Sequence, residues 1–348
     1  MKTMSIFFRF ILFTCTTFSI FNFDFTNGED ERLCCQELIS QNEININVDP
    51  TRRSSFSTIQ SAIDCVPSDN QKWILITVKA GVYKEQVNIP KDKPFIYLKG
   101  EGIKKTKVIW GAHDTMLTSA TFTSMADNIV VSGITFVNSY NYPPKKIGGS
   151  PVKQAVAARI VGDKSAFYEC SFLGYQDTLL DDKGRHFFKR CRIEGVVDFI
   201  FGRGQSIYEK CSISMIGMNP NSTGYIAAQA RDTPDDDSGF VFKHCNVTGK
   251  GNIYLGRAWK SYSRVIYYNS FFSENVVPQG WDVWDFAGHE NQLTFAEHDC
   301  KGPGSDKSER VGWEKKLTLE ELKSFISKSY IDSDGWMHKL PLSMKLDD

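Results

Sequence analysis

The chain has 348 residues, of which 41% are hydrophobic and 24% are charged, the balance of a soluble globular protein with a substantial core. Its 41 basic and 41 acidic residues give a formal net charge of zero. This balance argues against nucleic acid or an anionic membrane as the main partner.

The N-terminal segment, 1–28, has the features of a secretory signal peptide. Lys2 supplies a positive start, and the stretch 6–21 is mostly apolar, broken by Arg9 and a Thr/Ser cluster. A membrane anchor is the alternative, which the short, interrupted apolar run disfavours. We therefore expect a secreted, extracellular protein with a signal peptide over 1–28, an N-terminal extension over 29–45 and one folded domain over 46–345.

Cysteines and glycosylation motifs agree with this route. Eight of the nine cysteines follow the predicted signal, and an even number in an exported chain permits disulfides. No cysteine or histidine spacing indicates a metal site, so we predict no metal and no cofactor. Two sequons, at Asn221 and Asn246, give weak additional support for a glycoprotein.

A repeated pattern sets the expected architecture. Five segments align, each a short run of β-branched and aromatic residues bounded by turn residues, and an earlier segment at 128–137 resembles them. A recurring step of about 20 residues indicates a parallel β-helix, whose coils stack on one another, and a β-sandwich is the alternative. The five segments are 166–172, 187–193, 207–213, 240–247 and 265–272, and the first four contain Cys170, Cys191, Cys211 and Cys245 in turn.

Short helices are expected near both ends of this solenoid. The stretch 57–60 has the spacing of a capping box, and Thr318 and Glu321 repeat that signal before an apolar helical face. Such helices would shield the open ends of the stack.

The repeat also places two carboxylates together. Asp177 and Asp198 each end a Gly-x-x-Asp stretch, and they follow Cys170 and Cys191 at the same interval, so their separation in the sequence equals one repeat step. Stacked coils lie about 4.8 Å apart, so we expect the carboxylates to be close neighbours. Two such charges cannot both ionise easily, which favours a charged nucleophile beside a protonated acid. Two solvated turn aspartates are the alternative.

Asp198 needs a cationic partner. It lies in the apolar run 196–202, where an isolated charge would be costly. Arg257 is the candidate, since its guanidinium can hold a carboxylate ionised through two parallel hydrogen bonds.

Taken together, the motifs resemble those of the plant and microbial pectin methylesterases across nearly the whole mature chain. The resemblance is to the short form, which lacks the inhibitor-like pro-region. It implies a right-handed parallel β-helix that hydrolyses the methyl ester of galacturonate in pectin, releasing methanol. The matching stretches are Gly81–Glu85, Gln154–Ala157, Gly174–Leu179, Asp198–Gly202 and Leu255–Trp259.

Residue roles follow from the same resemblance. It implies that Asp198 is the nucleophile, that Asp177 is the general acid and then base, and that Arg257 orients Asp198. It also implies that Gln154 and Gln176 stabilise the oxyanion. Trp259 resembles a sugar-stacking residue, and Trp281 is a second candidate for that role. Tyr83 and Glu85 are expected to fix a turn, and Trp284 is expected to pack.

The chain departs from the family's pattern at two positions, and two disulfides are expected, one of them from the resemblance. Ala258 stands where the family usually has proline, and Leu180 where tyrosine is common. The resemblance implies a disulfide between Cys211 and Cys245. Stacked coils would also bring Cys170 and Cys191 into bridging range, with a ladder of free buried cysteines as the alternative.

The sequence is compatible with three functions: a pectin esterase, a glycoside hydrolase and a non-catalytic binding protein. The expected one is demethylation of pectin in the cell wall, by a monomer that a proteinaceous inhibitor can bind. A glycoside hydrolase of the pectin backbone would also use two carboxylates about 5 Å apart, but it would not need the glutamines and the arginine. A non-catalytic, wall-binding β-helix is the third.

Overall fold

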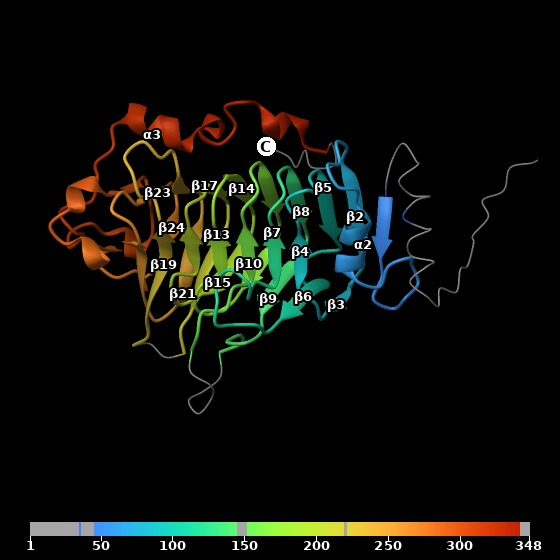
Figure 1. Cartoon of the computed structure of the whole chain (residues 1–348). Helices are drawn as coiled ribbons and strands as arrows, with labels where there is room; N and C mark the ends of the chain where they lie inside the picture. The colour runs from blue at the N-terminus through green and yellow to red at the C-terminus, as the bar shows by residue number, and fades with distance from the viewer. Residues whose placement is uncertain (1–34, 36–44, 145–151, 219–220, 342–348) are drawn as a thin grey trace, which may run out of the picture.

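The computed structural model describes residue 35 and residues 45–144, 152–218 and 221–341. The predicted signal peptide (1–28), most of the extension and the last residues of the predicted domain lie outside the described residues. Three parallel sheets run along the molecule and form a right-handed parallel β-helix (Figure 1), which confirms the predicted fold class.

We name the sheets A, B and C; each complete coil contributes one strand to each, and β1 and β26 at the two ends belong to sheet A alone. Sheet A contains β1 (Asn45–Val48), β2 (Ile74–Val78), β5 (Ile96–Gly100), β8 (Ile129–Ser132), β11 (Ser165–Tyr168), β14 (Arg185–Lys189), β17 (Gln205–Glu209), β20 (Gly239–Lys243), β23 (Arg264–Tyr268) and β26 (Thr294–His298). Sheet B contains β3 (Gly81–Tyr83), β6 (Thr106–Trp110), β9 (Thr135–Asn138), β12 (Ser171–Leu173), β15 (Arg192–Gly195), β18 (Ser212–Ile216), β21 (Asn246–Lys250) and β24 (Phe271–Phe272). Sheet C contains β4 (Val87–Ile89), β7 (Phe122–Ser124), β10 (Ala158–Ile160), β13 (Leu179–Asp181), β16 (Ile200–Gly202), β19 (Thr223–Gln229), β22 (Asn252–Ala258) and β25 (Trp281–Asp282).

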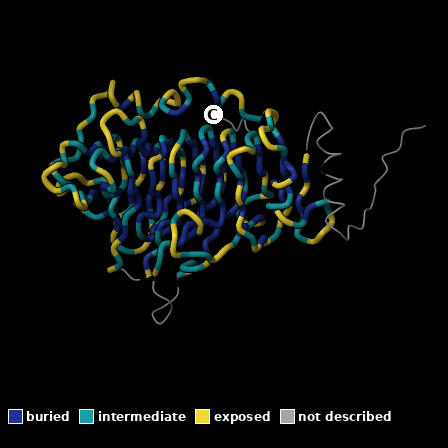
Figure 2. The backbone as a smooth tube through the Cα atoms, in the orientation of Figure 1, coloured by how far each residue is buried: buried dark blue, intermediate teal, exposed yellow. Residues whose placement is uncertain are grey.

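The register agrees with the repeat found in the sequence. Ala166 lies opposite Phe187, and Phe187 lies opposite Ile207, so one coil corresponds to one repeat step. Inward side chains of sheet A stack from coil to coil, since parallel strands place equivalent residues above one another. The ring centroids of Phe188 and Tyr208, for example, are 4.6 Å apart. These stacked residues form the buried interior, which Figure 2 shows in dark blue.

The corners between sheets A and B explain the position of the cysteines. The residue before each repeated cysteine has a positive φ, as at Glu169 (50°) and Arg190 (53°). One residue in this left-handed conformation turns the chain sharply, so that the next side chain points inward. The cysteine after it is therefore buried at the same place in every coil.

Both disulfides predicted within this ladder are wrong. Cys170, Cys191, Cys211 and Cys245 are buried free thiols. Each thiol instead donates to a backbone carbonyl of the preceding coil, as Cys211 does to Phe188 over 3.4 Å. The alternative that the sequence left open, a ladder of free cysteines, is the arrangement observed.

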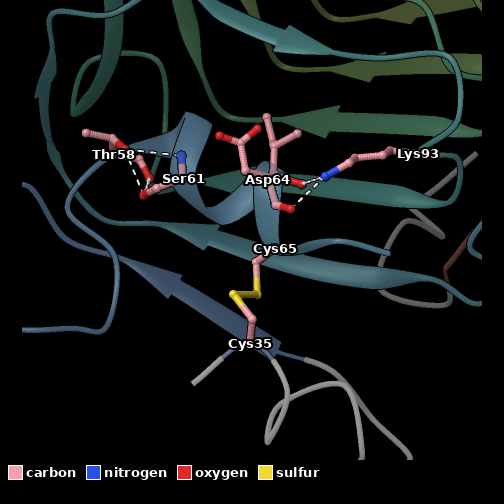
Figure 3. Close-up of a disulfide and its surroundings, with 7 residues drawn as sticks. Cys35, Thr58, Ser61, Asp64, Cys65 and Lys93 are labelled. Atoms are coloured by element: carbon pink, nitrogen blue, oxygen red, sulfur yellow. Dashed lines mark hydrogen bonds between the residues drawn. A yellow bond between two sulfur atoms is a disulfide. The ribbon is translucent and has the colours of Figure 1, made fainter. Parts of the chain in front are cut away.

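The disulfide that does form lies at the N-terminal end, between Cys35 and Cys65 (Figure 3). Cys65 ends helix α2 (Ile59–Cys65), whose apolar side chains close the core of the first coils. The helix begins one residue later than the sequence pattern suggested, with Thr58 as its N-cap. Glu85 also accepts hydrogen bonds from the first two amide groups of α2, which confirms a structural role for this motif residue.

The C-terminal helix has a different position from the predicted one. The capping box of Thr318 and Glu321 is present and begins α3 (Leu319–Ile326). However, α3 contacts β20, and the segment that follows runs back along the outside of sheet A (Figure 1). Leu322, Ile331 and Trp336 pack on the outward side chains of that sheet, so this segment covers a face and not the open end. Five 3-10 helices complete the described elements: Trp284–Phe286, Glu290–Gln292, Pro303–Ser305, Lys328–Tyr330 and Trp336–Lys339. No helix in the described part of the chain is long and apolar enough to cross a membrane.

A buried polar network lies inside the solenoid, beneath sheet C. Asp181 points inward and is fully buried, with His186 Nδ1 2.5 Å from one carboxylate oxygen and the hydroxyl of Tyr208 2.6 Å from the other. The second ring nitrogen of His186 faces the carbonyl of Gly162 at 2.9 Å. Burial opposes a charge on His186, but the Asp181 carboxylate and this carbonyl outweigh it and raise the pKa of the imidazole. The network thus joins sheets A and C through buried hydrogen bonds.

We predict that Asp181→Asn destabilises the protein by about 3 kcal/mol, because asparagine removes the buried negative charge opposite His186 and replaces one of the two acceptor oxygens by an NH2 donor. Urea unfolding followed by circular dichroism measures this change. Asp182→Asn is the matched control, since Asp182 forms a partly exposed ion pair with Arg159, and its loss should cost less than about 1 kcal/mol. Equal losses in the two variants would contradict a special role for the buried network.

Candidate active site

The two aspartates predicted to be neighbours lie in successive coils, at the corners that lead from sheet B into sheet C. Asp177 shortly precedes β13 and Asp198 shortly precedes β16, and the amide of Asp177 donates to the carbonyl of Val197 over 3.0 Å. Both side chains are almost completely buried, with 4% and 8% of their surface exposed. Both residues also have a positive φ, 60° and 47°, a strained conformation that directs their side chains to the same face. The predicted juxtaposition is therefore confirmed.

Arg257 holds Asp198 in a two-pronged ion pair. Its Nε lies 2.8 Å from one carboxylate oxygen of Asp198 and its Nη2 lies 2.5 Å from the other. Arg257 comes from β22, two strands along sheet C from β16, where its side chain points outward over the sheet. The parallel stacking thus brings together two residues that are 59 positions apart in the sequence.

Two aromatic rings contact the same guanidinium. Its central carbon lies 4.2 Å from the ring centre of Tyr225 and 3.6 Å from that of Trp284. Cation–π contacts of this kind restrict a planar guanidinium and leave its edge free for hydrogen bonds. The rings therefore help to fix the orientation of Arg257 toward Asp198.

The surroundings of the two carboxyl groups favour different protonation states. Burial and the nearby charge of Asp198 raise the pKa of Asp177 to about 7, although a hydrogen bond from Gln154 opposes the rise. Burial also raises the pKa of Asp198, but here the two hydrogen bonds and the charge of Arg257 oppose it. Asp198 has the cationic partner and Asp177 has a neutral amide, so the pair favours a charged Asp198 beside a protonated Asp177.

Both predicted glutamines lie beside this pair. Gln154 precedes β10 and Gln176 directly precedes Asp177, and both are partly exposed. The amide of Ala155 donates to the carbonyl of Gln176 over 3.3 Å, so the two glutamines belong to adjacent coils. Two neutral amide side chains therefore border the carboxylates, as oxyanion stabilisation would require.

The two predicted sugar-contacting tryptophans have different environments. Trp259 is partly exposed and packs on Phe201, with ring centroids 6.0 Å apart. Beneath it lies an apolar patch on the outer face of sheet C, which includes Leu180. Trp259 therefore remains a candidate for stacking on a sugar.

Trp281 cannot contact a substrate in this structure, and its predicted role is wrong. Only 1% of its surface is exposed, and its indole nitrogen donates to Glu297 over 3.1 Å. Trp281 lies in register with Gly256, in the row of sheet C that faces the core. The next residue, Asp282, lies in register with outward-facing Arg257, so the parity of the strand decides which side chain is buried.

Sequence reasoning missed Trp284 and Tyr225. Trp284 was expected to pack, but 37% of its surface is exposed and its ring covers Arg257. The pattern Trp281-x-x-Trp284 was visible, yet the strand ends at Asp282, so the sequence did not show which tryptophan faces outward. For Tyr225 there was no signal beyond its place in a strand.

Comparison with known proteins gives a consistent result. A family model described as "Pectinesterase" matches residues 45–334. The chain is 52% identical over 298 residues to "Probable pectinesterase 29" of Arabidopsis thaliana, covering 85% of this chain and 89% of that protein. Among solved structures, it resembles the pectin methylesterase from carrot, with 30% identity and a TM-score of 0.80 over 86% of this chain and 97% of that one. It also resembles a pectin methylesterase from Aspergillus niger, with 28% identity and a TM-score of 0.73 over 86% and 96% of the two chains.

Because the pKa of Asp177 is raised in the folded state, the stability of the protein should depend on pH. The folded state holds this proton to about pH 7, whereas the unfolded chain releases it near pH 4, so the wild-type protein loses stability as the pH rises through that window. Asp177→Asn has no such proton to release. We therefore expect the variant to be more stable than the wild type above pH 7, by at most about 4 kcal/mol, with the difference closing toward pH 4.

Melting temperatures measured from pH 4 to pH 8 check this expectation. Asp232→Asn, which removes an exposed aspartate elsewhere, is the control and should follow the wild-type curve. Parallel curves for Asp177→Asn and the wild type would show that Asp177 is not a strained acid.

Proposed function

The chain belongs to the pectinesterase family, and from this premise we propose which of its residues carry out the reaction. The enzyme is a carboxylic ester hydrolase that demethylates pectin. The observation that best supports the residue assignment is the ion pair between Arg257 and Asp198 beside Asp177. One carboxylate is held charged and the other holds a proton, which are the states needed by a nucleophile and an acid.

In the first step, the Asp198 carboxylate attacks the carbonyl carbon of the methyl ester. The negative charge that develops on the carbonyl oxygen accepts hydrogen bonds from the side-chain amides of Gln154 and Gln176. Asp177 donates its proton to the departing methoxy group, so methanol leaves and an acyl-enzyme anhydride remains at Asp198.

In the second step, the ionised Asp177 removes a proton from water. The resulting hydroxide attacks the acyl carbon, the bond to Asp198 breaks, and the carboxyl group of the galacturonic acid loses its proton to solvent as the product leaves as a carboxylate. Asp177 is protonated again, and Arg257 receives Asp198 as a carboxylate. Trp259, which packs on Phe201, and Trp284, which covers Arg257, supply partly exposed aromatic surface for the sugar rings of the polymer.

The cellular context is part of the proposal. The disulfide between Cys35 and Cys65 is typical of proteins that fold in an oxidising compartment, which supports a signal peptide over 1–28 and secretion to the cell wall. We also propose that the stretch 46–345 forms the catalytic domain and that the enzyme acts as a monomer. A proteinaceous inhibitor that covers the face carrying Trp259 and Trp284 is the proposed protein partner.

Methanol release from highly methylated pectin tests the assignment directly. We predict that Asp198→Ala lowers the rate by at least about 1,000-fold, because it removes the nucleophile, while Asp232→Asn retains activity. Polymer length, followed as new reducing ends, should stay constant in the wild type. New reducing ends without methanol would indicate a glycosidase, and a folded wild type that forms neither product would indicate a binding protein.

Arg257→Lys tests the ion pair separately from the nucleophile. Lysine keeps the positive charge but cannot form two parallel hydrogen bonds or lie flat between Tyr225 and Trp284. We predict a fall in kcat of about 10- to 100-fold with a smaller change in KM, as expected for a positioning residue. An unchanged kcat in the folded variant would refute this role.

A further inference from the structure

The outer face of sheet B carries an exposed asparagine beside an exposed phenylalanine. Asn246 begins β21 and is exposed, and in the sheet register it lies between Ser212 of β18 and Phe271 of β24. Side chains at one register position of neighbouring parallel strands point to the same face, about 5 Å apart. Asn246 therefore has a small neighbour on one side and an aromatic ring on the other.

Phe271 is an unusual residue for that position. It is 44% exposed, although the adjacent Phe272 fills the core. The ring lies against the backbone of Gly302, where an added Cβ atom would come within 2.8 Å of a ring carbon. The ring thus packs against the protein surface at Gly302, and it has no part in the reaction proposed above. An aromatic ring that is held in this way offers an apolar face on which a sugar ring can stack.

Asn246 is the first residue of the sequon Asn246-Val247-Thr248. Val247 points inward and is 1% exposed, so Asn246 and Thr248 lie on the outer face two residues apart. The folded protein therefore leaves room for a group attached to the Asn246 amide, and such a group would begin beside Phe271.

We propose that Asn246 carries an N-linked glycan whose first N-acetylglucosamine packs on the ring of Phe271. In the modification step, the Asn246 amide nitrogen attacks the anomeric carbon of a lipid-diphosphate-linked oligosaccharide. A carbon–nitrogen bond forms, the bond from the anomeric carbon to the diphosphate oxygen breaks, and the amide loses one proton. The lipid diphosphate leaves with the electron pair.

Packing on Phe271 gives this glycan a role in stability. The apolar face of a sugar ring covers an aromatic ring, as it does where sugars stack on tryptophan, and removes that ring from water. Asn246 lies on sheet B, whereas the esterase residues border sheet C, so the glycan leaves the reaction unaffected. Its attachment does not depend on the proposed function.

The occupancy of Asn246 is tested on the full chain secreted from a eukaryotic host. Asn221→Gln leaves Asn246 as the remaining sequon, and a peptide N-glycosidase should then increase the electrophoretic mobility by the mass of one glycan. The double variant Asn221→Gln, Asn246→Gln should show no such increase. A single variant whose mobility is unchanged by the glycosidase overturns the proposal.

The role of Phe271 is tested by removing the glycan in two ways. An endoglycosidase that leaves the first N-acetylglucosamine should hardly change the melting temperature, whereas complete removal should lower it by about 2 °C. In Phe271→Leu, which keeps apolar bulk over Gly302, complete removal should cause no further fall. Phe271→Tyr should retain the wild-type response. An equal fall in Phe271→Leu and the wild type would overturn the packing of the sugar on Phe271, and methanol release should be the same throughout.

Discussion

Hydrogen bonds between successive coils hold the backbone of this protein at one spacing from end to end. Because every sheet is parallel and the coils stack in register, residues one repeat apart in the sequence become neighbours in space. Asp177 and Asp198 are such a pair, and Arg257 reaches Asp198 from two strands further along the same sheet. The candidate active site is therefore a consequence of the stacking, with Asp177, Asp198 and Arg257 each supplied by a different coil.

The stacking also forces two carboxylates close together, and their repulsion disfavours the state in which both are ionised. Two buried carboxylates in adjacent coils repel each other, and the solenoid cannot move them apart without breaking its ladder of hydrogen bonds. Arg257, held between Tyr225 and Trp284, compensates one of the two charges. The other carboxyl group then retains its proton to about pH 7, which suits it to act as an acid and then as a base.

The remaining features stabilise the scaffold around this centre. The disulfide joins Cys35 to the last residue of α2, and the C-terminal segment covers sheet A. The network of Asp181 and His186 joins two sheets from the inside. The proposed glycan would cover part of sheet B, which leaves the outer face of sheet C open to a long polymer. Each sheet thus has a distinct outer environment, and the candidate active site lies beside one of them, sheet C.

The sequence by itself determined the repeat, the fold class and the proximity of Asp177 and Asp198, because one repeat step in the sequence becomes one coil spacing in space. It indicated Arg257 only as the cationic partner that a carboxylate in an apolar run requires. It did not determine which side chains face outward where a strand is very short, so Trp281 was assigned to the surface and Trp284 to packing. It also did not determine cysteine pairing: the corner geometry directs Cys211 and Cys245 toward backbone carbonyls, while Cys35 reaches Cys65 across a fold that no spacing reveals. These outcomes depend on side-chain direction and on contacts between distant segments, which only the tertiary structure decides.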